Sequence, residues 1–375
     1  MSDVVARNAS GSGSDVVRFQ LSMKTPSIID GICWFPDNKT LLIKSDGFRI
    51  VDVETRLVSK PLPILPLPSG ARFFISPNGA HLAVLWGGIR LFSTSDWQLL
   101  ADWRRMPPTR GETRGAAFSQ PGGVRFTPDS QFLWVASNPR TEKNETAIAV
   151  KLRIPDLQVV DAIDSAIPGA SYENTVITAN SDDVIERAYF RTDKRAPKQE
   201  TRRWHRLVVA ATNLENKSIV LAPKDVTPDV GDDYSISNDA LSADHSVYVL
   251  DRREVPPDMY YAESDPSVFS YDTRTSQRIA VFGLREERRT ETGRRSDLSN
   301  IVLLEGTDLG VSALTNPNYD GGFRVWNVRT GQLVQSLPAY GVLSLTVSND
   351  QKRIAVQFRD ELRIFSISTT NNGQR

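Results

Sequence analysis

Residues Phe323 to Val334 read Phe-Arg-Val-Trp-Asn-Val-Arg-Thr-Gly-Gln-Leu-Val. The run ends in the aromatic Trp326 followed by the polar Asn327, and its Phe and Val residues favour a buried, pleated strand. The polar Arg-Thr-Gly segment that follows favours a tight turn, and a second apolar run begins at Leu333. This segment therefore predicts a strand, a turn and another strand.

The same pattern recurs along the chain. Segments similar to the first strand of the quoted stretch are Phe48–Asp52, Ile89–Ser93, Val268–Asp272 and Leu362–Ser366. Upstream of such segments, apolar runs are interrupted by short turns at Pro36–Asn38, Pro77–Gly79, Pro128–Ser130, Ala243–His245 and Asn349–Gln351. Pro and Asx residues favour turns, and the flanking Val, Ile, Phe and Leu favour a buried, pleated surface. Four antiparallel strands in each repeat indicate the blade of a β-propeller.

Seven such units fit the chain, with starts near Gly31, Ala71, Val124, Asn174, Ser237, Asn300 and Val342. The predicted fold is all-β: a seven-bladed β-propeller of four-stranded antiparallel blades, with six or eight blades as alternatives. The last unit supplies three strands, and we expect the N-terminal strand Val16–Leu21 to pair with this blade and close the ring without a free edge. The predicted domains are a disordered N-terminal segment at 1–15, a single propeller domain at 16–367 and a disordered tail at 368–375.

These repeats resemble the WD-repeat β-propeller family over residues 16–366. The Trp-Asp pair that ends a strand in that family corresponds best to Trp326-Asn327 and more weakly to Tyr271-Asp272. The Gly-His pair of many members is missing, so we do not expect their His-centred hydrogen-bond network. The chain is similar to a divergent WD-like propeller, with the related YVTN-type and lactonase-type propellers as alternatives.

Composition limits the classes of partner. Lys and Arg together number 45 and so do Asp and Glu, and this neutral balance argues against a protein that coats nucleic acid or an anionic membrane. No apolar run approaches a membrane span, and Met1–Asp15 lacks the apolar core of a secretion signal. We therefore expect an intracellular protein, cytoplasmic or nuclear, that binds one or more proteins and no membrane, with nucleic acid an unfavoured partner.

The predicted connections differ in length between the two ends of the ring. Turns that join first to second strands are tight, whereas the connections expected at the opposite end are long: Pro61–Gly70, Arg104–Gly123, Asn138–Thr146, Thr192–Arg203, Lys224–Asp233, Glu254–Pro266 and Leu284–Ser299. Long loops held by a rigid scaffold often carry binding function. We therefore expect a partner to bind the end of the ring that carries the long connections.

Basic and aromatic residues in these connections are the predicted partner-binding residues. Interface hot spots favour Tyr and Arg, and charges of mixed sign orient a charged protein partner. The candidates are Arg104, Arg105, Arg110, Lys194, Arg195, Tyr260, Tyr261, Arg288 and Arg289.

The sequence carries no motif for catalysis, a cofactor or a metal, so none of these is predicted and the chain is not expected to be an enzyme. His81, His205 and His245 are expected to be surface or packing residues, and Cys33, the single cysteine, a small core residue. Two alternatives remain. One is a propeller hydrolase or lactonase with a metal at the channel, near acidic pairs such as Asp182-Asp183. The other is a nucleic-acid-associated propeller that uses Lys194–Arg206.

Overall fold

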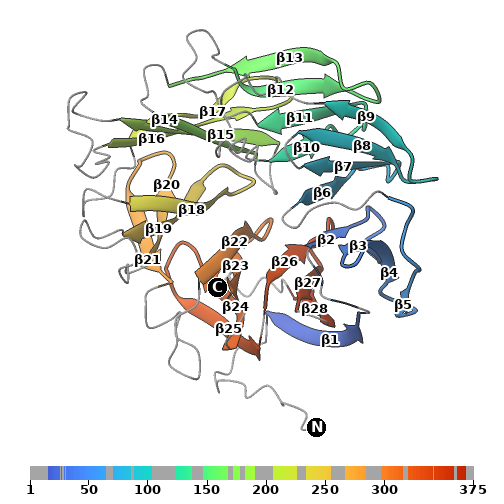
Figure 1. Cartoon of the computed structure of the whole chain (residues 1–375). Helices are drawn as coiled ribbons and strands as arrows, with labels where there is room; N and C mark the ends of the chain where they lie inside the picture. The colour runs from blue at the N-terminus through green and yellow to red at the C-terminus, as the bar shows by residue number, and fades with distance from the viewer. Residues whose placement is uncertain are drawn as a thin grey trace, which may run out of the picture.

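The computed structural model describes residues 16–25, 27, 29, 31–64, 71–85, 88–103, 123–136, 147–167, 172–177, 182–190, 206–225, 234–254, 267–283, 297–315, 320–340, 342–358 and 361–368. The regular secondary structure in these ranges consists of β-strands, arranged in seven four-stranded sheets. The sheets stand around a common axis as the blades of a propeller (Figure 1). The predicted all-β, seven-bladed fold is confirmed, and the alternatives of six or eight blades are wrong.

The blades are numbered from the N-terminal side. Blade 1 contains β2 (Gly31–Trp34), β3 (Thr40–Lys44), β4 (Phe48–Asp52) and β5 (Leu57–Val58). Blade 2 contains β6 (Arg72–Ile75), β7 (His81–Leu85), β8 (Ile89–Ser93) and β9 (Leu99–Trp103). Blade 3 contains β10 (Val124–Phe126), β11 (Phe132–Ala136), β12 (Ala147–Arg153) and β13 (Val159–Asp164). Blades 4 and 5 contain β14 (Tyr172–Ile177), β15 (Asp183–Phe190), β16 (Arg206–Asn213), β17 (Ile219–Asp225); β18 (Tyr234–Leu241), β19 (Val247–Glu254), β20 (Ser267–Asp272) and β21 (Arg278–Phe282). Blades 6 and 7 contain β22 (Asp297–Leu303), β23 (Leu309–Thr315), β24 (Asp320–Asn327), β25 (Leu333–Tyr340); β26 (Ser344–Val347), β27 (Arg353–Gln357), β28 (Glu361–Ile367) and β1 (Val17–Lys24).

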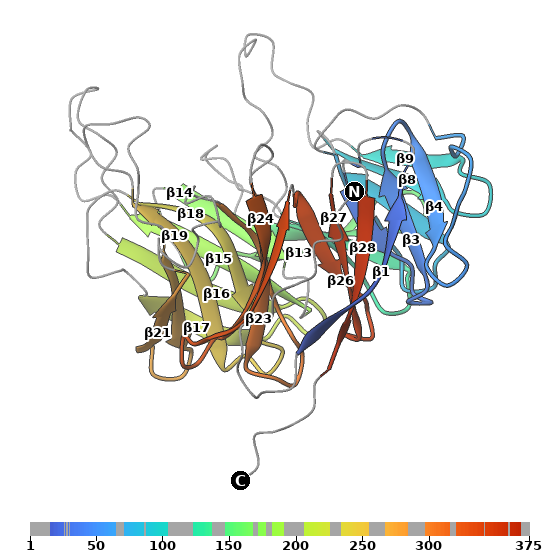
Figure 2. The same cartoon turned by 90° about the horizontal axis from the view of Figure 1, so that it is seen from below.

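The N-terminal strand closes the ring. In blades 1 to 6 the strands follow one another in chain order, whereas the order in blade 7 is β1-β28-β27-β26. β1 pairs antiparallel with β28 from Val17, opposite Ile367, to Lys24, opposite Glu361, and the two strands lie side by side in Figure 2. The predicted pairing of the N-terminal strand with the last blade is therefore confirmed.

Several strands are longer than their apolar patterns predicted. β18 starts at Tyr234 rather than near Ser237, and β22 starts at Asp297 rather than near Asn300. β17 and β19 continue into segments that the sequence placed in long connections, ending at Asp225 and Glu254. Backbone pairing extends these strands: Tyr234, for example, lies opposite Glu254. Ladder hydrogen bonds do not require apolar side chains, so hydrophobicity alone marks only the central part of each strand.

The hydrophobic core lies between neighbouring blades. Trp326 of β24 is fully buried and packs against Phe282 of blade 5, with ring centroids 5.6 Å apart. Gly310 lies opposite Trp326 in the ladder, and a Cβ at this glycine would come within 2.9 Å of Val328. The residue that resembles the family tryptophan thus serves the packing of one blade on the next.

Candidate functional site

Strand order gives the ring two different ends. Turns between first and second strands and between third and fourth strands lie at one end, which we call the tight-turn face. The connections between second and third strands and between successive blades lie at the other end, the long-loop face. β9 ends at Trp103 and β19 ends at Glu254, and both strand ends lie at the long-loop face.

The predicted partner-binding residues follow strand ends at the long-loop face. Arg104, Arg105 and Arg110 come after β9, and Lys194 and Arg195 lie between β15 and β16. The four others are Tyr260, Tyr261, Arg288 and Arg289, between β19 and β20 and between β21 and β22. All nine lie outside the described residues, so their role as binding residues stays a prediction.

On the tight-turn face, side chains hold the turns between first and second strands. In blade 2, Ser76 Oγ donates to Asn78 Oδ1 at 2.7 Å and accepts the His81 N–H at 2.9 Å. The same arrangement recurs in blades 3, 5 and 7 with Thr127-Asp129, Ser242-Asp244 and Ser348-Asp350. These four predicted turns therefore have a shared cause, a Ser or Thr two residues before an Asx residue, whereas in blade 1 Asp37 accepts hydrogen bonds from the Lys39 and Thr40 N–H groups instead.

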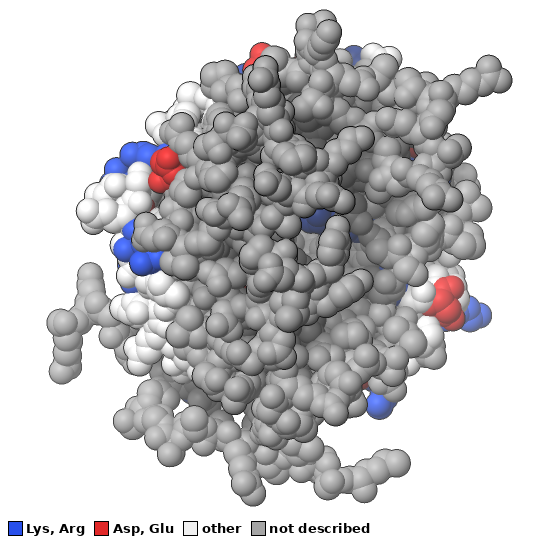
Figure 3. Space-filling view, turned by 60° about the vertical axis from the view of Figure 1, so that its left-hand side comes forward, with Lys and Arg blue, Asp and Glu red and all other residues white. Residues whose placement is uncertain are grey.

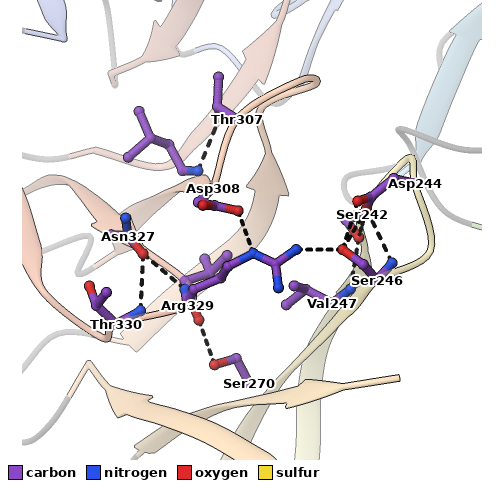
Figure 4. Close-up of polar contacts among 12 residues, drawn as sticks. Ser242, Asp244, Ser246, Val247, Ser270, Thr307, Asp308, Asn327, Arg329 and Thr330 are labelled. Atoms are coloured by element: carbon purple, nitrogen blue, oxygen red, sulfur yellow. Dashed lines mark hydrogen bonds and ion pairs between the residues drawn. The ribbon is translucent and has the colours of Figure 1, made fainter. Parts of the chain in front are cut away.

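A polar network joins these turns across blades 5 and 6 (Figure 4). Arg329 Nε lies 2.6 Å from Asp308 Oδ1, and Arg329 Nη2 donates to Ser246 Oγ at 2.6 Å. Ser246 Oγ donates in turn to Asp244. Burial of Asp244 opposes ionisation, but hydrogen bonds from Ser242 and Ser246 and the charge of Arg329 outweigh it and lower the Asp244 pKa to about 2. These polar side chains therefore interact with one another and stabilise the contact between blades 5 and 6.

Blades 4 and 5 are joined by a histidine contact that the sequence did not reveal. His245 Nε2 lies 2.6 Å from Oδ2 of the fully buried Asp183, and Asn213 Nδ2 donates to the other Asp183 oxygen at 3.1 Å. Asp182 forms an ion pair with Arg125 of blade 3 at 2.9 Å. The pair Asp182-Asp183 thus connects three consecutive blades. His245 and Asp183 are 62 residues apart, and no local pattern relates them.

Buried polar residues occur on second strands near the long-loop face, and the sequence did not indicate these either. Each of these residues pairs in the ladder with a residue on the first strand of its own blade, and each is 5% exposed or less. They are Lys44, Arg187, Asp251 and Gln357. Gln357 Nε2 donates to the Ile29 carbonyl at 2.6 Å. Buried charges need compensating partners, so these four buried side chains require a defined arrangement of the side chains around them.

Among the described residues of the first strands, one basic side chain is exposed. Arg72 begins β6, the innermost strand of blade 2, at the end nearest the long-loop face. Its guanidinium carbon lies 5.7 Å from the centre of the Phe74 ring. Burial lowers the pKa of the Arg72 guanidinium, because protein surrounds it on several sides even though water reaches it.

The remaining single-residue predictions concern His81, His205 and Cys33. His81 is half-buried at the start of β7, and burial lowers its pKa. His205 lies outside the described residues. Cys33 is half-buried in β2, and burial, partly offset by a backbone hydrogen bond from Ile75, raises its thiol pKa to about 11. This suppresses the thiolate at neutral pH, as expected for a packing residue.

Metal-binding clusters and membrane-spanning helices are both absent from the part of the chain that the structure describes. These residues contain no group of three or more His, Cys, Asp or Glu side chains arranged to hold a metal ion. They also form no helix long and apolar enough to cross a membrane. At the rim of the face in Figure 3, basic and acidic side chains of described residues lie next to each other.

Comparison with known proteins supports the fold. No protein-family model matches the sequence, and no curated protein matches it. The solved structure of U3-55K is similar, with a TM-score of 0.57 and 14% sequence identity, over 94% of this chain and 98% of that chain. At this identity the likeness shows the fold alone, and it agrees with the seven blades. A fold shared by many solved chains leaves function to be argued from surfaces.

Proposed function

We propose that this chain is a non-catalytic protein–protein interaction scaffold that binds a partner through its long-loop face. The observation that carries this proposal is the difference between the two ends of the ring. On the tight-turn face, polar side chains such as Arg329, Asp244 and His245 are engaged in turns and inter-blade contacts. The long-loop face receives the long connections, and loops on a rigid scaffold are the usual place for recognition.

The chemistry of the predicted residues agrees with a protein partner. Seven of the nine candidates are Arg or Lys and two are Tyr, and Arg and Tyr are enriched among interface hot spots. Balanced total charge, 45 basic against 45 acidic residues, favours orientation of a partner over general attraction to polyanions. Tyr260 and Tyr261 would supply contact area, and the arginines would set orientation.

Site-specific photo-crosslinking tests the proposal. A photoreactive phenylalanine analogue is placed at Tyr260 in one full-length protein and at Lys352, an exposed residue of the tight-turn face, in another. We expect protein crosslinks from position 260 and few from position 352, in extracts of cells that express the chain. Equal yields from both positions, or crosslinks mainly from position 352, would contradict the assignment of the face.

A double variant tests the two tyrosines themselves. Tyr260→Ala combined with Tyr261→Ala should weaken capture of the crosslinked partner by roughly tenfold or more, because loss of a hot spot costs about 2 kcal/mol. The melting temperature should stay unchanged. Unchanged capture would remove both tyrosines from the site.

A further inference from the structure

Arg72 has an unusual position for an exposed arginine. It lies on β6, the first strand of blade 2, and first strands are nearest the axis in Figure 1. The next residue, Phe73, is 7% exposed and packs edge-to-face on Phe48 of blade 1, with ring centroids 5.2 Å apart. Phe73 packs between blades 1 and 2, whereas the Arg72 side chain is exposed, at the end of this innermost strand nearest the long-loop face.

Among the described residues, the first strands of blades 1, 3 and 7 carry no acidic side chain level with Arg72. Counting back from the last residue of each first strand, the equivalent positions are Gly31 in blade 1 and Gly123 in blade 3. In blade 7 the equivalent residue is Ser344, whose hydroxyl donates to Gln357 Oε1 at 2.8 Å. None of these three residues can neutralise a guanidinium.

Arg125 provides a comparison, because its charge is neutralised although it also lies on a first strand. It lies on β10 of blade 3 and is ion-paired with Asp182 at 2.9 Å. Arg72 has no such pair among the described residues, and its guanidinium lies near the ring of Phe74. The protein thus neutralises one first-strand guanidinium and leaves the other available.

We propose that Arg72 binds a carboxylate in an acidic segment of the partner protein at the long-loop mouth of the channel. This inference rests on the proposed function and names the chemistry of its partner. A guanidinium binds a carboxylate through two parallel hydrogen bonds, and such charge-assisted pairs are stronger than neutral ones. Contact with the Phe74 ring restricts the Arg72 guanidinium, so the side chain loses less conformational freedom on binding. Partial exclusion of water strengthens the attraction further.

A carboxylate ligand fits the described residues better than a phosphate backbone does. Nucleic-acid binding needs several basic side chains along a groove, and it weakens steeply as salt is added. On the first strands with described side chains, the charged residues are Arg72 and the neutralised Arg125. One available guanidinium suits a single acidic side chain.

Fluorescence anisotropy with the full-length protein tests this inference. The probe is a fluorescein-labelled octaglutamate peptide, and a dT oligonucleotide of similar charge serves as the competing ligand class. Arg72→Gln should weaken peptide binding about tenfold or more, as expected for loss of a hydrogen bond between charged groups. Arg274→Gln makes the same change at an exposed arginine of the tight-turn face and should alter binding less than about twofold. Arg72→Lys keeps the charge but lacks the planar guanidinium, so its affinity for the peptide should lie between those of wild type and Arg72→Gln.

The outcomes separate the inference from the proposed function. Equal affinity for Arg72→Gln and Arg274→Gln, or no peptide binding by wild type, would overturn the role of Arg72 while leaving the crosslinking result untouched. Tighter, Arg72-dependent binding of the oligonucleotide would overturn it in favour of phosphate. Should Arg72→Gln fail to fold, the comparison of Arg72→Lys with Arg274→Lys gives the same decision.

Discussion

Glu186, on β15 of blade 4, is a carboxylate almost entirely removed from water, with 1% of its surface exposed. It accepts a hydrogen bond from the Ser165 hydroxyl of blade 3 and another from the Ala166 N–H at 2.9 Å. Burial raises the Glu186 pKa above its ordinary value, although these hydrogen bonds oppose the shift. The ionised form is therefore less stable in the folded protein than in the unfolded chain.

A neutral substitute at this position should stabilise the protein at neutral pH. Because the folded pKa of Glu186 is raised, its protonation favours folding, and this contribution is fully present below the unfolded pKa and lost as pH rises through the folded pKa. Glu186→Gln is always neutral and can keep both contacts if its amide donates to Ser165. We expect the free energy of unfolding at pH 7 to rise, since each unit by which burial raises the pKa corresponds to about 1.4 kcal/mol that a neutral side chain does not lose.

Urea unfolding at several pH values checks this prediction. The advantage of Glu186→Gln over wild type should shrink as pH falls toward 4.5, where the native side chain is protonated as well. A variant that is less stable than wild type at pH 7, or an advantage that grows as the solution is acidified, would contradict the prediction.

At the scale of a single strand, β24 shows what the sequence pattern could recognise. The quoted segment predicted a strand ending at Asn327, and β24 does end there. Its apolar side chains Phe323, Val325 and Trp326 are all fully buried, because the two faces of a blade pack against different neighbours. The pattern of such strands is readable from sequence because burial on both faces leaves many apolar residues in a short run.

Trp326 should be the most sensitive position of this strand. Trp326→Ala removes a ring buried against Phe282 and should lower the free energy of unfolding by about 3 to 5 kcal/mol. Trp326→Phe should cost far less, since the buried indole N–H has no hydrogen-bond partner among the described residues. Trp103, half-buried on an outer strand, provides a Trp→Ala control with a smaller expected loss. A near-neutral Trp326→Ala would show that the ring does not hold blades 5 and 6 together.

For the whole molecule, closure of the ring depends on contacts that the N-terminal part of the chain makes with the C-terminal blades. Gln335 of β25 in blade 6 accepts the Val17 N–H at 2.9 Å and donates to the Val17 carbonyl at 2.8 Å. Val17 itself is 1% exposed, within the cluster that joins blades 6 and 7. Trp34 Nε1 donates to the Thr346 carbonyl at 3.3 Å, which ties blade 1 to blade 7. The closing blade is thus held from both sides.

Removal of the Gln335 side chain should loosen this closure. Gln335→Ala eliminates both hydrogen bonds to Val17 and should lower the free energy of unfolding by about 1 to 3 kcal/mol. Amide hydrogen exchange should become faster in β1 and β28 before it does in other blades. Ser336→Ala, at the exposed neighbouring position, should change neither quantity. Uniform acceleration in all blades would contradict a local role in closure.

The candidate site was less accessible to prediction than the fold. The sequence identified residues by type and loop position, such as Arg104 and Tyr260, and these remain predictions. It gave no indication of Arg72, because an arginine at the start of a strand is ordinary in isolation. What distinguishes Arg72 is the set of residues level with it, Gly31 and Gly123, and these come from other blades.

The sequence by itself predicted the central parts of the strands, the tight turns, seven blades as the favoured number and the strand that closes the ring. These follow from local patterns, since short apolar runs and the Pro and Asx residues of turns act over a few neighbouring positions. Only the tertiary structure decided which polar groups meet: His245 with Asp183, Arg329 with Asp308 and Ser246, and Arg72 with no acidic neighbour among the described residues. The physical reason is that a ring brings together residues from separate repeats, and electrostatic and hydrogen-bond energies depend on distance in space rather than along the chain.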